Sequence, residues 1–164
     1  QFYCHNYFAG STFSEGNCKI VTTGGNITYN TSTMGFSSGK WYMEVKLGSS
    51  SGEVLGVIRG VSTGNNNDNK IGNRSDGFGY DYRGLVEGNG ADLAGTYFFA
   101  VGDNHGSNAA TLEVNFGNPI SALDNTAITD DNGHGAFEYS PKITGDSVAK
   151  KFYALNTKNL AEFG

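Results

Sequence analysis

A strict alternation of apolar and polar side chains between residues 41 and 47 (WYMEVKL) limits most strongly how this chain can fold. Successive side chains of an extended chain point to opposite faces, so the alternation predicts a strand with one buried face. The residues expected to fill the core are Trp41, Met43, Val45 and Leu47. The residues expected to face solvent or a second layer are Tyr42, Glu44 and Lys46.

Short apolar runs separated by turn-forming residues indicate an all-β chain. The 164 residues include 25 Gly and 18 Asn but only 2 Pro, a composition typical of many tight turns. Further strands are expected at 17–23, 27–29, 53–61, 76–83, 96–102, 110–116 and 136–139. The most direct arrangement of these strands is an antiparallel β-sandwich, with a barrel as the alternative.

The segments between the expected strands have turn or loop compositions. Residues 62–75 are expected to form a long surface loop, 84–95 is glycine-rich, and DNHGSN at 103–108 has the composition of a hairpin turn. Gly56 and Gly60, inside an apolar run, suggest a bulge or a close approach by another backbone. Residues 117–135 are a polar connector, and 146–163 form either an amphipathic helix or an extended tail.

Charge and hydropathy exclude two classes of partner. The formal net charge is −5, and the 11 Lys and Arg residues are scattered rather than clustered. Binding to a phosphate backbone depends on clustered cations, so we expect no nucleic-acid partner. No apolar run approaches the roughly 20 residues of a membrane-spanning helix, so we expect no membrane insertion.

Cys4 and Cys18 are the only cysteines. They form a disulfide if the chain matures outside a reducing compartment, and are otherwise small apolar residues. Neither has a CxxC partner, so the sequence predicts neither a metal nor a cofactor.

Several motifs together resemble SPRY-like domains, which are concanavalin-like β-sandwiches. SSGKWYMEVKL is similar to the strand in which a Gly-Lys turn leads into an aromatic-aromatic-x-Glu-Val run. EVLGVIRG, DGFGYDYRGLVEGNG and TLEVNFGNP resemble later segments of the family, in the same order. Both ends of the chain resemble members of the family that bacteriophages, marine phages in particular, encode in virion and tail-fibre-type proteins. The matching segments are STFSEGNCKIV near the N-terminus and NGHGAFEYSP with FYALNTKNLAEFG near the C-terminus.

The chain departs from the family pattern at one place. Only ADLA, residues 91–94, lies where the family has a central strand pair, so this pair is either trimmed or omitted. A trimmed sandwich leaves sheet edges open, and open edges favour an oligomer or packing against other virion proteins.

Three candidate chemistries depend on side chains in strands and turns. Glu44 and Glu113 are the pair that a lectin-fold glycan hydrolase would use, since such enzymes need two carboxylates across a groove. His105 and His134 lie in glycine-rich turns, where a solvated histidine is the usual case. The acidic stretches at 65–69 and 129–135 bring oxygen ligands together, but their spacing does not match a DxDxDG calcium loop.

Binding through exposed loops is the activity that the sequence favours, because loops on a stiff sandwich commonly carry recognition. Aromatic rings that stack on sugars, with amide groups that bind hydroxyls, suit a glycan. The candidate ligand-binding residues are Asn65, Asn66, Asn67, Tyr80, Tyr82, Arg83 and Asn89.

The expected protein is therefore non-catalytic. We expect residues 1–164 to form a single SPRY-like domain, a module of a longer chain, located on a phage particle assembled in the host cytoplasm. It would present loops to a glycan or protein of the host surface. The alternatives are a purely structural decoration or connector domain and, less favoured, a glycan hydrolase.

Overall fold

The computed structural model describes residues 11–23, 28–48, 52–59, 71, 77–81, 86–88, 95–103, 107–141, 147 and 150–164. Within these residues the chain is mostly β, with one short helix, α1 (Thr157–Phe163). The strands are β1 (Ser11–Ser14), β2 (Lys19–Thr22), β3 (Thr28–Phe36), β4 (Trp41–Tyr42), β5 (Glu44–Leu47), β6 (Glu53–Arg59), β7 (Gly77–Asp81), β8 (Val86–Gly88), β9 (Tyr97–Asp103), β10 (Thr111–Asn115) and β11 (Tyr153–Ala154).

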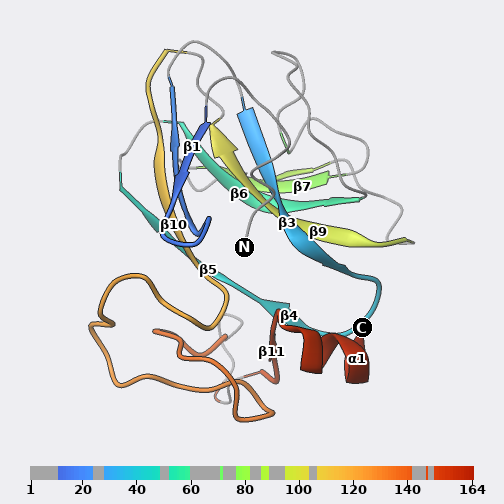
Figure 1. Ribbon diagram of the computed structural model, residues 1–164. Coiled ribbons are helices and arrows are strands. Elements are labelled where there is room, and N and C mark those ends of the chain that lie inside the picture. Colours follow the sequence, from blue (N-terminus) through green and yellow to red (C-terminus); the bar gives the residue numbers. More distant parts are fainter. Residues whose placement is uncertain are drawn as a thin grey trace. The chain divides into compact units, whose positions relative to one another are not determined.

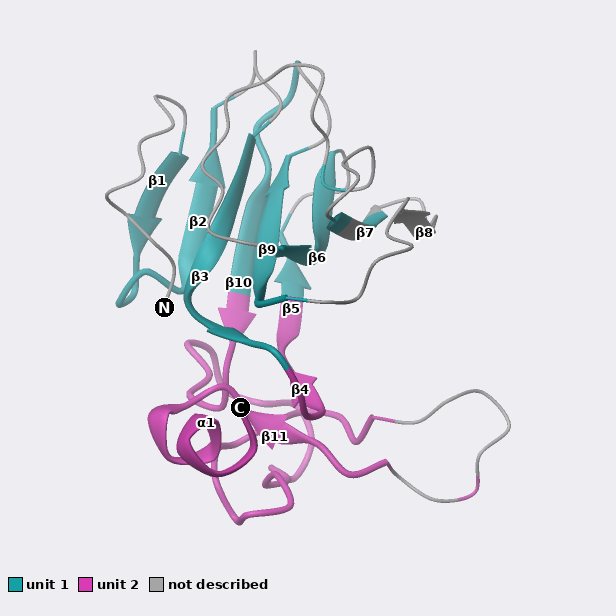
Figure 2. Ribbon diagram, turned by 90° about the vertical axis from the view of Figure 1, so that its right-hand side faces the viewer, with its two compact units in different colours: residues 1–37, 46–113 teal, residues 38–45, 114–164 magenta. Residues whose placement is uncertain are grey.

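The chain divides into two compact units, coloured separately in Figure 2. Unit 1 comprises residues 1–37 and 46–113, and unit 2 comprises residues 38–45 and 114–164. Two strands, β5 and β10, each contribute residues to both units. The expectation of a single domain stays a prediction.

Unit 1 is built on two sheets (Figure 1). One has the strand order β1-β2-β10-β5, and the other has the order β3-β9-β6-β7-β8. The pairs β1–β2, β2–β10, β3–β9, β6–β9, β6–β7 and β7–β8 are all antiparallel. A hydrogen bond from the Thr22 hydroxyl of β2 to Asp103 Oδ2 of β9, at 2.8 Å, joins the two sheets. The predicted all-β antiparallel sandwich is confirmed.

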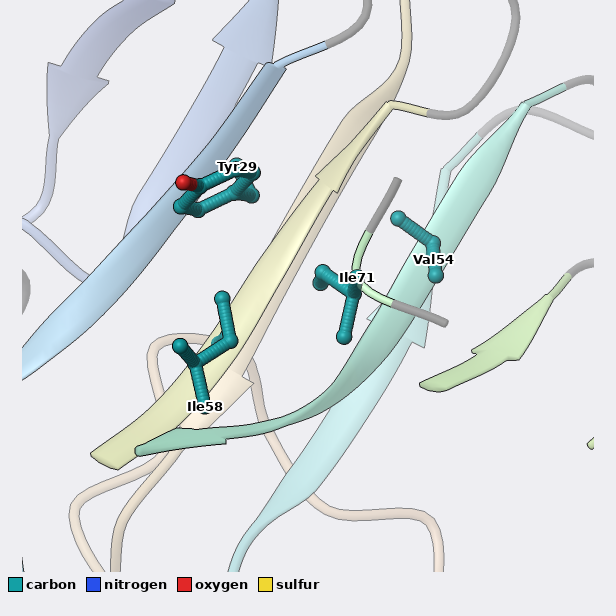
Figure 3. Packing of buried hydrophobic residues seen from close by; sticks show 5 residues of the cluster. Tyr29, Val54, Ile58 and Ile71 are labelled. Carbon is teal, nitrogen blue, oxygen red and sulfur yellow. The ribbon is translucent and has the colours of Figure 1, made fainter. Parts of the chain in front are cut away.

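Both faces of the β3-β9-β6 sheet are buried. One face carries Val101 and Phe99, while Ile20 and Leu112 are buried on the first sheet. The other face carries Tyr29, Val54, Ile58 and Ala100, which form a cluster with Ile71 (Figure 3). Ile71 is fully buried, so the prediction of a surface loop over 62–75 is wrong at this residue, and the rest of that loop lies outside the described residues.

Small residues occupy one row of this sheet, where Gly56 of β6 pairs with both Gly79 of β7 and Ala100 of β9. The predicted bulge or close backbone approach at Gly56 stays a prediction, but a close approach does occur at Gly102, a glycine that the sequence did not single out. A Cβ added there would lie 1.9 Å from the carbonyl oxygen of Thr28 on β3. The predicted role of Gly60 falls outside the described residues.

The predicted burial pattern of residues 41–47 is wrong. The segment is two short strands, β4 and β5, interrupted at Met43. Leu47 is 42% exposed, and Trp41, Met43 and Val45 are only half-buried. The ring of Tyr42, expected to face solvent or a second layer, packs against the buried side chains of Phe137 and Phe152, whereas Lys46 is exposed as expected.

The DNHGSN segment does not close a hairpin. The strands on either side of it, β9 and β10, belong to different sheets, so the connection crosses from one sheet to the other. The prediction relied on turn composition, which does not distinguish a hairpin from a crossing between sheets. The glycine-rich stretch 84–95 contains β8, a strand that the sequence analysis missed.

Unit 2 has little regular structure. Strand β11 pairs with β4 in parallel, with Tyr153 opposite Trp41 and Ala154 opposite Tyr42. The expected strand at 136–139 is a single bridge between Ile128 and Phe137. The C-terminal region combines both expected forms, an extended piece at β11 and a helix of only seven residues.

Two further expectations depend on residues outside the described part of the chain. Cys18 is a free thiol, but Cys4, its predicted disulfide partner, is not among the described residues. The ADLA segment, residues 91–94, where the strand pair is trimmed or omitted, is not described either.

Candidate functional site

Of the predicted ligand-binding residues, only Tyr80 is described. It lies on β7, and its side chain is 47% exposed. It therefore remains a candidate contact residue of unit 1. The other predicted residues, Asn65, Asn66, Asn67, Tyr82, Arg83 and Asn89, lie outside the described residues.

Unit 2 presents a second candidate surface, the aromatic face, made of Trp41, Tyr153 and Phe163. The pairing of β4 with β11 places Trp41 directly opposite Tyr153, and directly paired residues share one side of a sheet. Their ring centroids are 6.1 Å apart, in a tilted arrangement. The ring of Phe163, at the end of α1, stacks on Tyr153 at 4.0 Å with an interplanar angle of 12°.

Local hydrogen bonds hold the aromatic face in place. The Trp41 indole Nε1 donates to the carbonyl oxygen of Ser38, and the Ser38 hydroxyl donates to the carbonyl oxygen of Phe163. The helix that carries Phe163 begins after Asn156, whose side chain caps it by accepting from the backbone N–H of Asn159. All three rings are half-buried, so they remain partly accessible from one side.

The opposite side of the same two strands is a buried aromatic cluster. Tyr42 packs on Phe152 at 4.8 Å and on Phe137 at 5.4 Å, and these two rings meet edge-on at 5.3 Å. Such tilted and edge-on contacts are the favoured geometries for aromatic pairs. The aromatic face is therefore backed by close packing.

Glu44, one of the two candidate catalytic carboxylates, is a structural anchor of unit 2. Its carboxylate accepts hydrogen bonds from the backbone N–H groups of Glu138 and Tyr139, at 2.9 and 2.8 Å, and from the Asn115 amide at 2.9 Å. The Tyr42 hydroxyl donates to Glu44 Oε1 at 3.3 Å. Burial, reinforced by the Glu44 carboxylate, raises the pKa of the Tyr42 phenol above its usual value.

Glu113, the other candidate, belongs to unit 1. Its carboxylate forms an ion pair with Lys19 at 3.0 Å, between the paired strands β10 and β2. Both candidate carboxylates therefore have structural partners within their own unit.

Asp130 organises the acidic loop at 129–135. Its carboxylate accepts from the backbone N–H groups of Asn132, His134 and Ala154 and from the Asn159 amide, at 2.7–2.9 Å. Burial alone would raise the pKa of Asp130, but these hydrogen bonds outweigh it and lower the pKa. The loop uses its carboxylate oxygens to bind its own backbone, which is the usual role of Asp in a turn.

The described residues contain neither a metal-ligand cluster nor a membrane-spanning helix. That part of the chain contains no group of three or more His, Cys, Asp and Glu side chains that could hold a metal ion. Among the same residues, no helix has the length and apolar character needed to cross a membrane.

A comparison with protein families finds no family model that matches the chain. A comparison with curated proteins finds no significant match. The SPRY-like resemblance therefore remains one of motifs and their order.

The sequence analysis missed the aromatic face because its members are distant in sequence. Trp41 was expected in the core, and Tyr153 and Phe163 lay in a segment expected to be either a helix or a tail. The remaining signal was the concentration of aromatic residues in FYALNTKNLAEF, residues 152–163.

Proposed function

We propose that this protein is a non-catalytic recognition module of a bacteriophage particle, and that the aromatic face of unit 2 binds a glycan of the host surface. The observation that carries this proposal is the grouping of three half-buried rings on one side of the β4–β11 pair. Tryptophan and tyrosine supply large, rigid contact areas and are enriched in binding surfaces. The flat faces of sugar rings match such a surface.

The anchoring of the polar groups also supports this proposal. The carboxylates of Glu44, Glu113 and Asp130 are engaged by partners within the fold. The carboxylates considered for catalysis or metal binding are thus committed to the fold, and the aromatic face is the candidate binding surface of unit 2. The phage location rests on the resemblance of the N-terminal and C-terminal segments to virion-associated domains.

The position of Trp41 allows a direct test, because it is the only tryptophan of the chain. The protein would be screened on a glycan array and on host cells, and the best oligosaccharide would be titrated against tryptophan fluorescence. A ligand on the aromatic face should shift Trp41 emission to shorter wavelength, and Tyr153→Leu should weaken binding by about tenfold or more, as loss of a central aromatic contact does.

Two exposed tyrosines serve as matched controls. Tyr139 is 62% exposed and belongs to unit 2, and Tyr80 belongs to unit 1. Tyr139→Ala and Tyr80→Ala should leave the fluorescence titration unchanged. If the oligosaccharide leaves Trp41 emission unchanged and Tyr80→Ala abolishes its binding, the binding site lies at β7 instead. Failure to bind any glycan or host cell would refute the proposal.

The sheet edges favour a second candidate function, a connector that packs against other virion proteins. Among the described strands, β5 ends its sheet, and it carries the exposed Leu47. An open edge strand with an exposed apolar side chain is a template for another chain. If the protein is a connector, Leu47→Lys should block incorporation into particles and leave host-cell binding unchanged. If it is a recognition module, Leu47→Lys should be incorporated normally, and host-cell binding should be weakened by Tyr153→Leu.

A further inference from the structure

A row of buried oxygen-bearing side chains crosses three neighbouring strands of unit 1. Thr28 of β3 pairs in register with Asp103 of β9, and Asp103 pairs in register with Glu53 of β6. Directly paired residues project from the same face of a sheet, with Cβ atoms about 5 Å apart. All three side chains are buried, with 1%, 0% and 1% exposure respectively. We refer to Thr28, Asp103 and Glu53 as the acidic row.

The facing sheet holds the central carboxylate in position. The Thr22 hydroxyl donates to Asp103 Oδ2 at 2.8 Å, and the Ala110 backbone N–H donates to that hydroxyl oxygen at 2.8 Å. Outer hydrogen bonds of this kind orient the ligands of metal sites. The acidic row therefore faces the interior between the two sheets, with Asp103 oriented before any ligand binds.

The Thr28 hydroxyl supplies an independent observation. Its Oγ1 atom is fully buried and has no hydrogen-bond partner among the described residues. A buried hydroxyl without a partner is unfavourable, and such groups in folded proteins usually indicate a missing ligand or water. The residue paired with Thr28 is Asp103, so the hydroxyl lies on the carboxylate side of the sheet.

We propose that the acidic row is a calcium site, with Glu53 and Asp103 as carboxylate ligands and the Thr28 hydroxyl as a third oxygen ligand. A divalent cation between two carboxylates on adjacent strands attracts both, and this attraction is strong in a buried setting. An all-oxygen ligand set selects hard cations rather than zinc. Calcium is favoured over magnesium because magnesium demands strict octahedral geometry and retains its waters.

This site differs from the acidic stretches that the sequence draws attention to. It uses single residues from three strands, so no sequence motif reports it. It also lies entirely in unit 1, and it does not depend on the glycan-binding role proposed for unit 2.

The test measures calcium binding to the intact chain by titration calorimetry and by thermal unfolding, with EDTA, magnesium and calcium compared at equal ionic strength. Calcium at about 100 times its Kd should raise Tm by about 5–10 °C, and magnesium should raise it much less. The expected Kd lies at about 0.1–1 mM, in the range of extracellular modules.

Two nearly isosteric variants separate ligation from folding. Thr28→Val replaces the buried hydroxyl with a methyl group, so it should keep or raise Tm in EDTA but weaken calcium binding by about tenfold. Glu53→Gln removes one of the two adjacent charges and should abolish the calcium-induced rise in Tm. The matched control is Glu15→Gln, at an exposed carboxylate of unit 1, which should retain the full rise.

Several outcomes would overturn the proposal. Wild-type protein that shows neither binding heat nor a rise in Tm up to 10 mM calcium would do so. So would a calcium response that survives unchanged in both Thr28→Val and Glu53→Gln. If Glu53→Gln fails to fold, Thr28→Val alone decides the question.

Discussion

At the scale of single residues, carboxylates that accept backbone N–H groups are the main structural device of unit 2. Besides Glu44 and Asp130, Asp131 accepts from Phe152, and Glu138 accepts from Asp124 and Asn125. Unit 2 has few paired strands, so these side chains satisfy backbone groups that a sheet would otherwise pair. The sequence correctly suggests a turn role for Asp130, but not its bond to Ala154.

The lowered pKa of Asp130 predicts acid sensitivity. Its ordinary pKa in the unfolded chain is about 3.9, and the folded value is lower. The stabilisation is therefore complete above about pH 4 and is lost as the pH falls through the folded-state pKa. Urea unfolding between pH 2 and pH 7 should show this loss in wild-type protein and a flatter profile in Asp130→Asn.

The control for the acid effect is Asp124→Asn, which removes an exposed carboxylate of the same unit. Its unfolding free energy should follow the wild-type pH profile. If Asp124→Asn and Asp130→Asn flatten the profile equally, the hydrogen bonds of Asp130 are not the cause.

Trp41 was expected to fill the core, but Phe137 is the more deeply buried of these two aromatic residues. Trp41 is half-buried, whereas Phe137 is fully buried and contacts two rings. Phe137→Ala should destabilise the protein by about 3–5 kcal/mol, and Trp41→Ala by only about 1–2 kcal/mol. Chemical unfolding followed by far-UV circular dichroism measures both, since Trp41→Ala removes the fluorescence signal. A larger loss for Trp41→Ala would contradict the arrangement of β4.

At the scale of elements, strands with β-branched or aromatic runs were predictable, while their partners were not. Residues 53–59, 77–81 and 111–115 fall within predicted strands. Residues 97–103 do so except at Asp103, which was predicted to lie in a turn. Strand β11 has only two residues and is too short for any periodicity to identify. The strand predicted at 136–139 is reduced to one bridge at Phe137. The predicted alternation at 41–47 is lost because the segment is two strands interrupted at Met43, and Trp41 and Tyr42 are both half-buried. When two aromatic side chains are adjacent, alternation cannot tell which one faces the core.

The close approach of β3 to β9 predicts a strong effect of one methyl group. In Gly102→Ala the new Cβ would meet the backbone of Thr28, which cannot move without disturbing the strand pairing. We expect a loss of about 3 kcal/mol or more. In the control Gly16→Ala, the Cβ meets no atom within 4 Å and only the positive φ of 63° is unfavourable, so the loss should be about 1 kcal/mol. Equal unfolding midpoints for the two variants would refute this difference.

At the scale of the whole molecule, the sequence predicted the class of fold but not the division into two units. Two of the three boundaries fall within β5 and β10, where no linker composition marks them, and the third lies between Ser37 and Ser38 in a Gly-Ser stretch. The candidate surfaces likewise differ in how far the sequence predicts them. Tyr80 could be predicted because it lies in an aromatic strand, whereas the aromatic face and the acidic row depend on pairings between distant segments.

The net charge predicts how the molecule associates. The chain carries −5 at pH 7 and has an isoelectric point near 5.0. Repulsion between copies should vanish near pH 5, so sedimentation velocity should show more self-association at pH 5 than at pH 7.5. Leu47→Lys should reduce it at both pH values. Self-association that is the same at pH 5 and pH 7.5 would show that charge repulsion between copies does not control it.

The parallel pairing of Trp41 with Tyr153 has a consequence for biosynthesis. As the chain leaves the ribosome, the segment around Trp41 emerges well before its partner strand β11, which lies far downstream in the sequence. Contacts between such distant segments form slowly, and unpaired apolar surface favours aggregation in the interval. Yield should therefore be more sensitive to premature termination before residue 153 than to changes in the loops of unit 1.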